Sequence, residues 1–179
     1  MRCKMFIMRS FILIFMIIFF SCKGEKSSDD QNKLKNPTKE SLEEINKLLV
    51  DKDAELIKSY IERRGWKMEV SKSGLWHMIY KEGKGDLIKK GDYITFDYEV
   101  WLLDGTLIYS SEELGPKSFT VGKGGVESGL EEGVLMLNKG SKARFILPPH
   151  LAYGLIGDEK KIPARAIIIY DIEILNIED

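Results

Sequence analysis

The chain has 179 residues, 44% hydrophobic and 31% charged, which suffices for one domain of ordinary size with some additional length. Its 27 basic and 28 acidic residues almost balance, and three of the basic ones, Arg2, Lys4 and Arg9, precede position 22, where no acidic residue occurs. Without those three, the remainder has 24 basic and 28 acidic residues, a net charge of −4. A mildly acidic body with no basic block or stripe argues against a nucleic-acid partner.

Residues 1–21 have the organisation of a signal peptide. The basic start precedes an apolar run over 11–20, which is too short for a membrane span. The run stops at Ser21-Cys22, and polar residues follow at once. This pattern resembles a bacterial lipoprotein signal, in which a small residue precedes a cysteine that is lipidated and becomes the new N-terminus. It predicts membrane anchoring through Cys22; the alternative is a plain signal peptide with an incidental cysteine.

Only two cysteines occur, Cys3 and Cys22. Cys3 would leave with the signal peptide and Cys22 would be acylated, so the mature chain would have neither a disulfide nor a free thiol. We therefore expect a domain that is stable in an oxidising compartment through its core alone.

A polar stretch without aromatic residues, 22–40, predicts a flexible tether or simply disorder. Ser41-Leu-Glu-Glu44 then has the spacing of a capping box, and apolar residues recur at helical spacing as far as Arg63-Arg64-Gly65. These signals predict a helical extension over 41–65, formed by one helix or by two abutting ones. Its apolar face needs a partner, either the following domain or another subunit.

From Trp66 onward the apolar period changes to two, and we expect one domain over 66–179. Asp104-Gly105 between two alternating runs indicates a hairpin. Other turn signals separate the extended runs, which we expect at 66–70, 75–80, 93–103, 107–110, 119–121, 141–147 and 167–177. The sum is an α+β domain, an antiparallel sheet with one crossing helix.

The crossing helix is predicted over 126–137. Its apolar residues recur at helical spacing, Gly140 serves as a plausible C-cap, and Glu131 and Glu132 fall on a solvated side. The surface between this helix and the sheet is the candidate site. The alternative is that Val126 and Leu130 are simply core residues.

Reactive chemistry has no signature in the sequence. The two histidines, His77 and His150, have no nucleophile or acid at a defined spacing, and neither a GxSxG nor an HExxH motif occurs. The glycines between 122 and 125 do not match a phosphate loop. What remains is an apolar, aromatic site for which we expect neither a metal nor a cofactor.

Three blocks of the chain, in order, resemble the FKBP-type peptidyl-prolyl isomerases. The first spans 98–111 and contains the hairpin, the second spans 122–133, and the third runs from Ile146 to Leu175 and includes Tyr153-Gly154 and Ile162-Pro163. Order, spacing and residue type all agree, and the resemblance covers about residues 70–179. The signal, the helical extension and 64–68 further resemble the FKBP-type lipoprotein that is associated with gliding motility in bacteria.

The resemblance implies an FKBP-like half-barrel, a curved antiparallel sheet wrapped around one short helix, with a proline-binding hollow between them. The hydroxyl of Tyr153 and a backbone N–H near Glu127 would hold the carbonyls of a bound segment, and macrolide-type compounds would be further ligands. The implied catalytic residues are Tyr98, Tyr153 and Tyr170, and the implied substrate-binding residues are Ile108, Tyr109, Phe119, Val126, Glu127, Leu130 and Ile162.

Four positions depart from the pattern of many members. Tyr109 stands where an aspartate supports the polar wall of the hollow and orients a tyrosine. Glu127 replaces an isoleucine, Leu130 a floor tryptophan and Tyr170 a phenylalanine. Tyr109 would either fill part of the hollow or point away, which affects turnover and ligand preference.

Three hypotheses follow. The chain is an active prolyl isomerase that assists protein folding, tethered by lipid in the cell envelope at the inner or the outer membrane. Alternatively it is a module that binds proline-containing segments with poor turnover because of Tyr109. A structural part in a motility or secretion assembly, with the helix over 41–64 as its contact face, is compatible with either.

Overall fold

The computed structural model describes residues 38–178. The signal peptide, the lipidation site Cys22 and most of the predicted tether lie outside these residues. The sheet and the greater part of the N-terminal helix belong to one compact unit, Glu43–Asp179. Among the residues described, no helix combines the length and the apolarity that crossing a bilayer demands.

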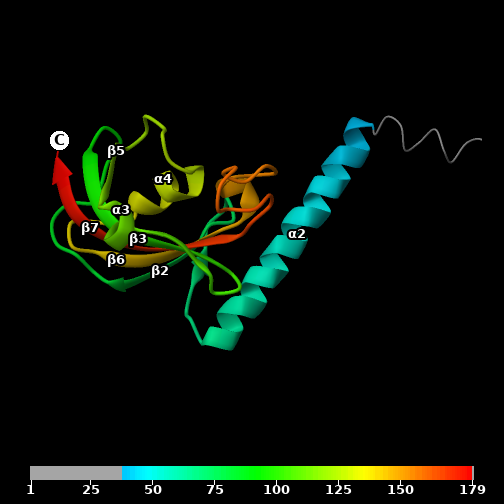
Figure 1. Ribbon diagram of the computed structural model, residues 1–179, viewed down its shortest axis with the longest axis horizontal. Coiled ribbons are helices and arrows are strands. Elements are labelled where there is room, and N and C mark those ends of the chain that lie inside the picture. The colour runs from blue at the N-terminus through cyan, green and yellow to red at the C-terminus, as the bar shows by residue number, and fades with distance from the viewer. Residues whose placement is uncertain (1–37, 179) are drawn as a thin grey trace, which may run out of the picture. The chain divides into compact units, whose positions relative to one another are not determined.

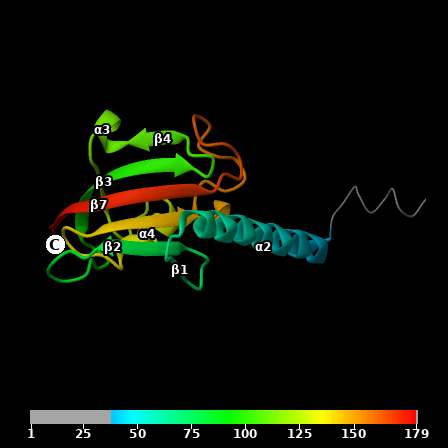
Figure 2. The same cartoon turned by 90° about the horizontal axis from the view of Figure 1, so that it is seen from below.

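The core of this unit is a seven-stranded sheet in the order β1-β2-β6-β7-β3-β4, with β5 also paired to β3. All its pairings are antiparallel, and Figure 2 shows β4, β3 and β7 running side by side. The predicted α+β fold, an antiparallel sheet with one crossing helix, is confirmed. The strands are β1 (Glu69–Val70), β2 (Trp76–Lys81), β3 (Tyr93–Leu102), β4 (Leu107–Ser110), β5 (Lys117–Thr120), β6 (Lys142–Leu147) and β7 (Ile168–Glu178).

Alternating side chains give the sheet two apolar faces, because successive residues of a strand point to opposite sides. One face, here the α4 face, carries a large buried cluster that includes Tyr98, Phe145 and Tyr170. The other, here the α2 face, carries a smaller cluster that includes Ile146 and Ile169. Neighbours in sequence thus serve different cores, and each face has its own helix.

Helix α4 (Ser128–Val134) packs on the first of these faces (Figure 1). It is shorter than the predicted 126–137: it begins at Ser128, and its end tightens into turns in which Met136 and Leu137 donate to the carbonyls three residues earlier. Val134 and Leu137 are nevertheless fully buried, so the apolar spacing marked buried residues correctly but not the helix end. Gly140 is not its C-cap, since its N–H donates to Ile174 O instead.

Helix α2 (Lys39–Arg64) is one continuous helix. It begins two residues before the predicted start because Thr38, not Ser41, caps it: Thr38 Oγ1 accepts from the Ser41 N–H at 3.3 Å. Lys39 and Glu40, which the sequence assigned to the tether, therefore belong to the helix. Ile57, Tyr60 and Ile61 are buried in the smaller cluster, so the domain itself is a partner for this part of the helix.

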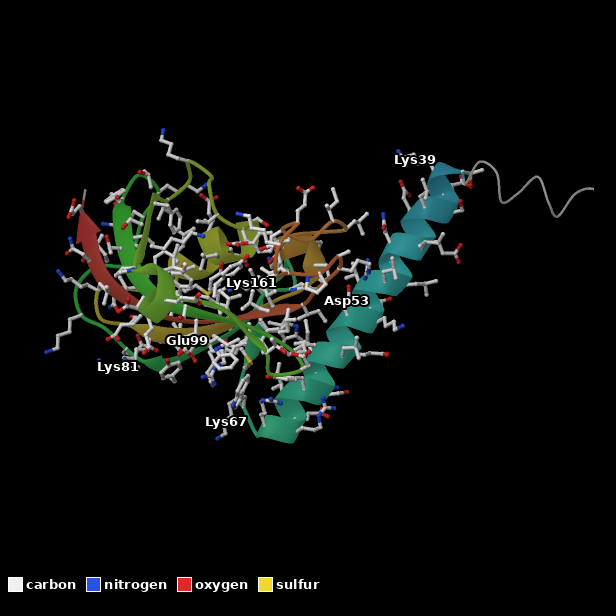
Figure 3. All side chains as sticks on the ribbon, in the orientation of Figure 1. Lys39, Asp53, Lys67, Lys81, Glu99 and Lys161 are labelled. Atoms are coloured by element: carbon white, nitrogen blue, oxygen red, sulfur yellow. The ribbon has the colours of Figure 1, made fainter. Side chains whose placement is uncertain are left out.

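Charged groups support the same packing. The Arg64 guanidinium lies 3.7 Å from the centre of the Tyr60 ring, and the Arg144 guanidinium lies 4.2 Å from that of Trp66. Trp66 itself lies outside the strands, because the extended run predicted from residue 66 is only two residues long, as β1. Asp53 on α2, labelled in Figure 3, pairs with Arg165 at 2.8 Å.

Two short elements were not predicted. Helix α3 (Ser111–Leu114) follows β4 directly, and Ser110 caps it by accepting from the Glu113 N–H at 3.2 Å. The 3-10 helix η1 (Pro149–Leu151) follows β6. It leads into the loop that carries Tyr153, on its way to β7.

Candidate functional site

A cavity of about 450 Å³ opens on the α4 face. Four of the predicted site residues line it: Tyr98, Tyr109, Tyr153 and Tyr170. Its other lining residues, Val100, Leu114, Lys117, Asp158 and Lys160, were not predicted. Val100 could have been found because it alternates with Tyr98 on one strand, whereas Asp158 and Lys160 lie in a loop without periodicity.

The other six predicted residues do not line this cavity. Ile108, Phe119, Leu130 and Ile162 are buried in the core cluster, Val126 packs against that cluster, and Glu127 is buried. The complete burial of Leu130 agrees with the alternative that it is a core residue. The predicted lipidation site, Cys22, is outside the described residues.

The aromatic wall of the cavity is built by strand pairing. Val100 on β3 is directly opposite Tyr170 on β7, and Tyr98 is opposite Ile172, so Tyr98 and Tyr170 point to the same side. Their ring centres are 6.5 Å apart. The Phe96 ring is tilted against Tyr98 and meets Phe119 edge to face, with 5.9 Å between ring centres in both pairs. The wall is therefore fixed by the sheet rather than by a loop.

Tyr109 neither fills the hollow nor points away from the site. From β4 its hydroxyl donates to the Asp158 carboxylate in the loop. The same carboxylate accepts from the N–H groups of Ile162 at 2.7 Å and of Lys160 at 2.9 Å. Lys161, labelled in Figure 3, donates to the Ile108 carbonyl at 3.3 Å. Together these bonds fasten the loop that follows Tyr153 to β4.

The pKa values of this pair follow its geometry. The hydrogen bond to Asp158, with burial, raises the pKa of the Tyr109 hydroxyl. Burial acts to raise the pKa of Asp158, but the hydrogen bonds from Tyr109 and from the backbone outweigh it and lower that pKa. Asp158 is therefore ionised at neutral pH. Its contact with Tyr109, which fastens the loop to β4, is here called the loop latch.

Glu127 places an acid under the aromatic wall. Tyr170 donates its hydroxyl proton to Glu127 Oε1 at 3.1 Å, and both residues are buried. Burial and then the Glu127 carboxylate raise the pKa of Tyr153, and the same two causes raise that of Tyr170. All four phenols that line the cavity have raised pKa values and stay protonated. Tyr109 and Tyr170 donate their protons to Asp158 and Glu127, which leaves Tyr98 and Tyr153 as donors for a bound segment.

Helix α4 is held close to the sheet by two glycines. A Cβ on Gly133 would lie 2.7 Å from the Phe145 ring, and one on Gly129 would lie 2.7 Å from Leu147. Two acids that were predicted to be solvated also hold the helix. Glu131 accepts from the N–H groups of Gly122 and Gly124, each at 3.1 Å. Glu132 accepts from the Ser73 hydroxyl at 2.6 Å.

Neither histidine lines the cavity. His150 Nε2 is 2.9 Å from the Ser73 carbonyl, and His77 lies on β2 with Nε2 3.8 Å from Glu69. The cavity thus offers apolar and aromatic walls, phenol donors and lysines near its opening. Such a surface can enclose an apolar ring and donate hydrogen bonds to carbonyls around it.

Comparisons with known proteins agree with this geometry. Residues 85–175 match the family described as FKBP-type peptidyl-prolyl cis-trans isomerase. The chain is 40% identical over 92 residues to human peptidyl-prolyl cis-trans isomerase FKBP9, covering 51% of this chain and 16% of that protein. It is 34% identical over 166 residues to the isomerase FkpA of Aeromonas hydrophila, covering 87% of this chain and 60% of the relative.

Among solved structures, the crystal structure of FkpA from Escherichia coli is similar, with a TM-score of 0.63 and 29% identity. That match covers 77% of this chain and 64% of the E. coli chain. The chain thus spans only part of the length of each of these relatives. The matched segment contains strands β3 to β6, most of β7, α4 and the residues that line the cavity, and this chain belongs to the FKBP-type peptidyl-prolyl cis-trans isomerase family.

Proposed function

We propose that the protein is a peptidyl-prolyl cis-trans isomerase that acts on proline-containing segments of cell-envelope proteins. The observation that carries the proposal is the cavity that Tyr98, Tyr153 and Tyr170 line together with the apolar Val100 and Leu114. A proline ring fits such a hollow, and Tyr98 and Tyr153 are the donors for the carbonyls beside it.

The physical reason for catalysis is the amide bond itself. Rotation about an Xaa-Pro bond must overcome a barrier of about 18–20 kcal/mol, because the amide loses its resonance in the twisted state. Uncatalysed exchange takes tens of seconds or longer at 25 °C. The twisted amide has less charge separation than the planar one, so an apolar cavity favours it over either planar isomer. Fixed phenol donors orient the neighbouring carbonyls at no further reorganisation cost.

The loop latch supports turnover by this site. Tyr109 and Asp158 fasten the loop that carries Tyr153, so the substitution of Tyr109 for the family's aspartate leaves a polar contact in place. The module hypothesis, binding without turnover, remains the alternative. The two hypotheses predict different effects of Tyr109→Asp on turnover.

The test is cis/trans exchange of a short Leu-Pro peptide, followed by NMR with the full chain in detergent. We expect acceleration by the wild type, and a loss on the order of tenfold in Tyr153→Phe if one transition-state hydrogen bond is removed. Tyr109→Asp should not raise turnover. Peptide binding without acceleration by the wild type, or raised turnover in Tyr109→Asp, would instead support the module.

The envelope location rests on the sequence, namely the apolar run and Cys22. We infer a lipid anchor there, which at about 0.8 kcal/mol per buried methylene would hold firmly with several acyl chains. Fractionation of cells that express the wild type or Cys22→Ser tests it. The wild type should sediment with membranes and Cys22→Ser should not; an equal distribution would contradict the anchor.

A role in a motility or secretion assembly is a second candidate, favoured by one observation. Ile45, Leu48 and Leu56 on α2 are 49%, 63% and 48% exposed. Deleting the helix would also remove the buried Ile57, so substitution of exposed positions is the sharper test. Leu48→Glu with Leu56→Glu should weaken association with the assembly while leaving peptide isomerisation intact. Unchanged association would argue against α2 as the contact face.

A further inference from the structure

Glu127 stands at the N-cap of α4, yet its side chain caps nothing. The residue is extended, with φ −62° and ψ 141°, and makes no side-chain capping bond. Its backbone carbonyl accepts from the N–H groups of Leu130 and Glu131, each at 3.0 Å, as the first helical turn requires. An acid at this place would ordinarily turn back onto those N–H groups. Here the carboxylate turns into the protein instead.

The carboxylate is buried and incompletely paired. Glu127 is only 8% exposed, and its Oε1 accepts from the Tyr170 hydroxyl at 3.1 Å. Its Oε2 is inaccessible to solvent and has no hydrogen-bond partner within residues 38–178. A buried carboxylate with an unpaired oxygen is destabilising. Such a group persists where it has a task other than stability.

The groups that face this carboxylate come from three elements. Tyr98 is on β3, Tyr170 on β7 and Tyr153 in the loop after η1, and all three line the cavity. Two more acids act on these phenols, Glu113 on Tyr98 and Asp158 on Tyr153. Among residues 38–178, Glu127 is the one residue whose charge raises the pKa of all three phenols.

We propose that Glu127 is a positioning residue for the isomerisation: by accepting the hydroxyl proton of Tyr170, its carboxylate fixes that phenol in the wall of the cavity beside Tyr153, which donates to the bound proline segment. It acts through these phenols and does not touch the substrate. The inference rests on the proposed isomerase function. It also explains why a polar phenol stands at position 170 in an otherwise apolar wall, since Tyr170 is the partner that holds Oε1.

The main variant is Glu127→Gln, which keeps the shape of the side chain and an oxygen that can accept from Tyr170 but removes the charge. The matched control is Glu132→Gln, the same change on the same helix, at an acid that bonds Ser73 rather than a phenol. Three quantities are measured with the full chain in detergent: kcat and KM for the Leu-Pro peptide, the melting temperature, and phenol ionisation by ultraviolet absorbance.

We expect Glu127→Gln to lower kcat on the order of tenfold with KM within about twofold. The variant loses the carboxylate charge that holds the phenols, and these phenols contribute to the transition state rather than to substrate binding. The melting temperature should not fall. A negative charge opposes formation of a phenolate, so its removal should shift the first phenol ionisation to lower pH, and the loss of activity at alkaline pH should follow. Glu132→Gln should match the wild type in kcat and in phenol ionisation.

A second variant keeps the inference falsifiable if Glu127→Gln folds poorly. Tyr170→Phe should lower kcat similarly, and the double variant should be no worse than either single one, because both remove the same positioning unit. Additive losses would overturn the inference, as would wild-type kcat and phenol ionisation in Glu127→Gln, or parallel losses of kcat and stability in both glutamine variants. A wild type without acceleration would overturn the proposed function and the inference with it, an outcome distinct from wild-type catalysis that ignores Glu127.

Discussion

The two faces of the sheet bury similar kinds of residue, but the α2 face forms a structural contact whereas the α4 face carries the candidate site. The α2 face also has a hollow, of about 350 Å³, lined by Tyr60, Trp66 and Trp101 among others. Its charged groups are paired: Arg144 binds Asp171, and Trp101 donates to Glu99 at 3.2 Å. The α4 face instead leaves phenol hydroxyls around a cavity and an unpaired carboxylate oxygen beneath them. A buried carboxylate with an unpaired oxygen, more than the presence of a hollow, distinguishes the candidate site from a structural contact.

The largest expected effect comes from removing a buried side chain from the α2 face. Ile57 is fully buried in the smaller cluster, so Ile57→Ala should lower the free energy of unfolding by about 2–5 kcal/mol. Turnover of the folded protein should not change, because the cavity is on the other face. Urea unfolding and peptide isomerisation measure the two effects. Leu56→Ala, at an exposed neighbour, should cost less than about 0.5 kcal/mol; a loss of turnover with Ile57→Ala would show that the faces are coupled.

Lifting α4 should affect stability and turnover together. In Gly133→Ala the new methyl group would meet the Phe145 ring, so the helix or the ring must move, at a cost of about 1–3 kcal/mol. Because Glu127 precedes the same helix, turnover should fall as well. Thermal unfolding and the isomerisation assay check this, with Ser128→Ala at an exposed position of α4 as control. Unchanged turnover despite lost stability would mean that the site does not depend on the seating of α4.

The smallest expected effect is at the loop latch, and it depends on pH. Asp158→Asn weakens the bonds from Tyr109 and the backbone and should cost about 1 kcal/mol at pH 7. The folded-state pKa of Asp158 is lowered, so its stabilisation is present above the unfolded value of about 3.9 and is lost as the pH falls through the lower folded value. The difference from the wild type should therefore shrink between pH 6 and pH 3, as measured by urea unfolding.

Glu159, the exposed residue that follows Asp158, offers a control for the urea unfolding measurement. Glu159→Gln removes a charge from the same loop without touching the latch. It should show little difference from the wild type at either pH. A difference for Asp158→Asn that stayed constant down to pH 3 would mean that shape, and not charge, fastens the loop.

Apolar alternation and helical spacing predicted the positions of strands and helices, which depend on residues close together in the sequence. Alternation located β3, β6 and β7 to within a residue or two, and helical spacing found the buried Leu130 and Val134. The ends of α2 and α4 were missed because a cap at Thr38 and tight turns after Val134 decide them.

The polar contacts of the site were beyond sequence reasoning for a different cause. Tyr109 and Asp158 are 49 residues apart, and Glu127 and Tyr170 are 43 apart. Nothing in spacing predicts such a meeting, since it depends on strand register and on the path of a loop. The available signal was a paired departure: both 127 and 170 carry polar groups where the family pattern is apolar. Two such changes in one hollow indicate a contact between them.

The length of its edge strands determines how readily another chain could add to the sheet. A strand edge is a template onto which another chain can add, and long, flat edges lead to aggregation. Here β1 spans two residues, and the opposite edge is divided between β4 and β5, which pair with different parts of β3. Each offers at most four residues of backbone. Such short edges offer little backbone onto which another extended chain could add as a further strand.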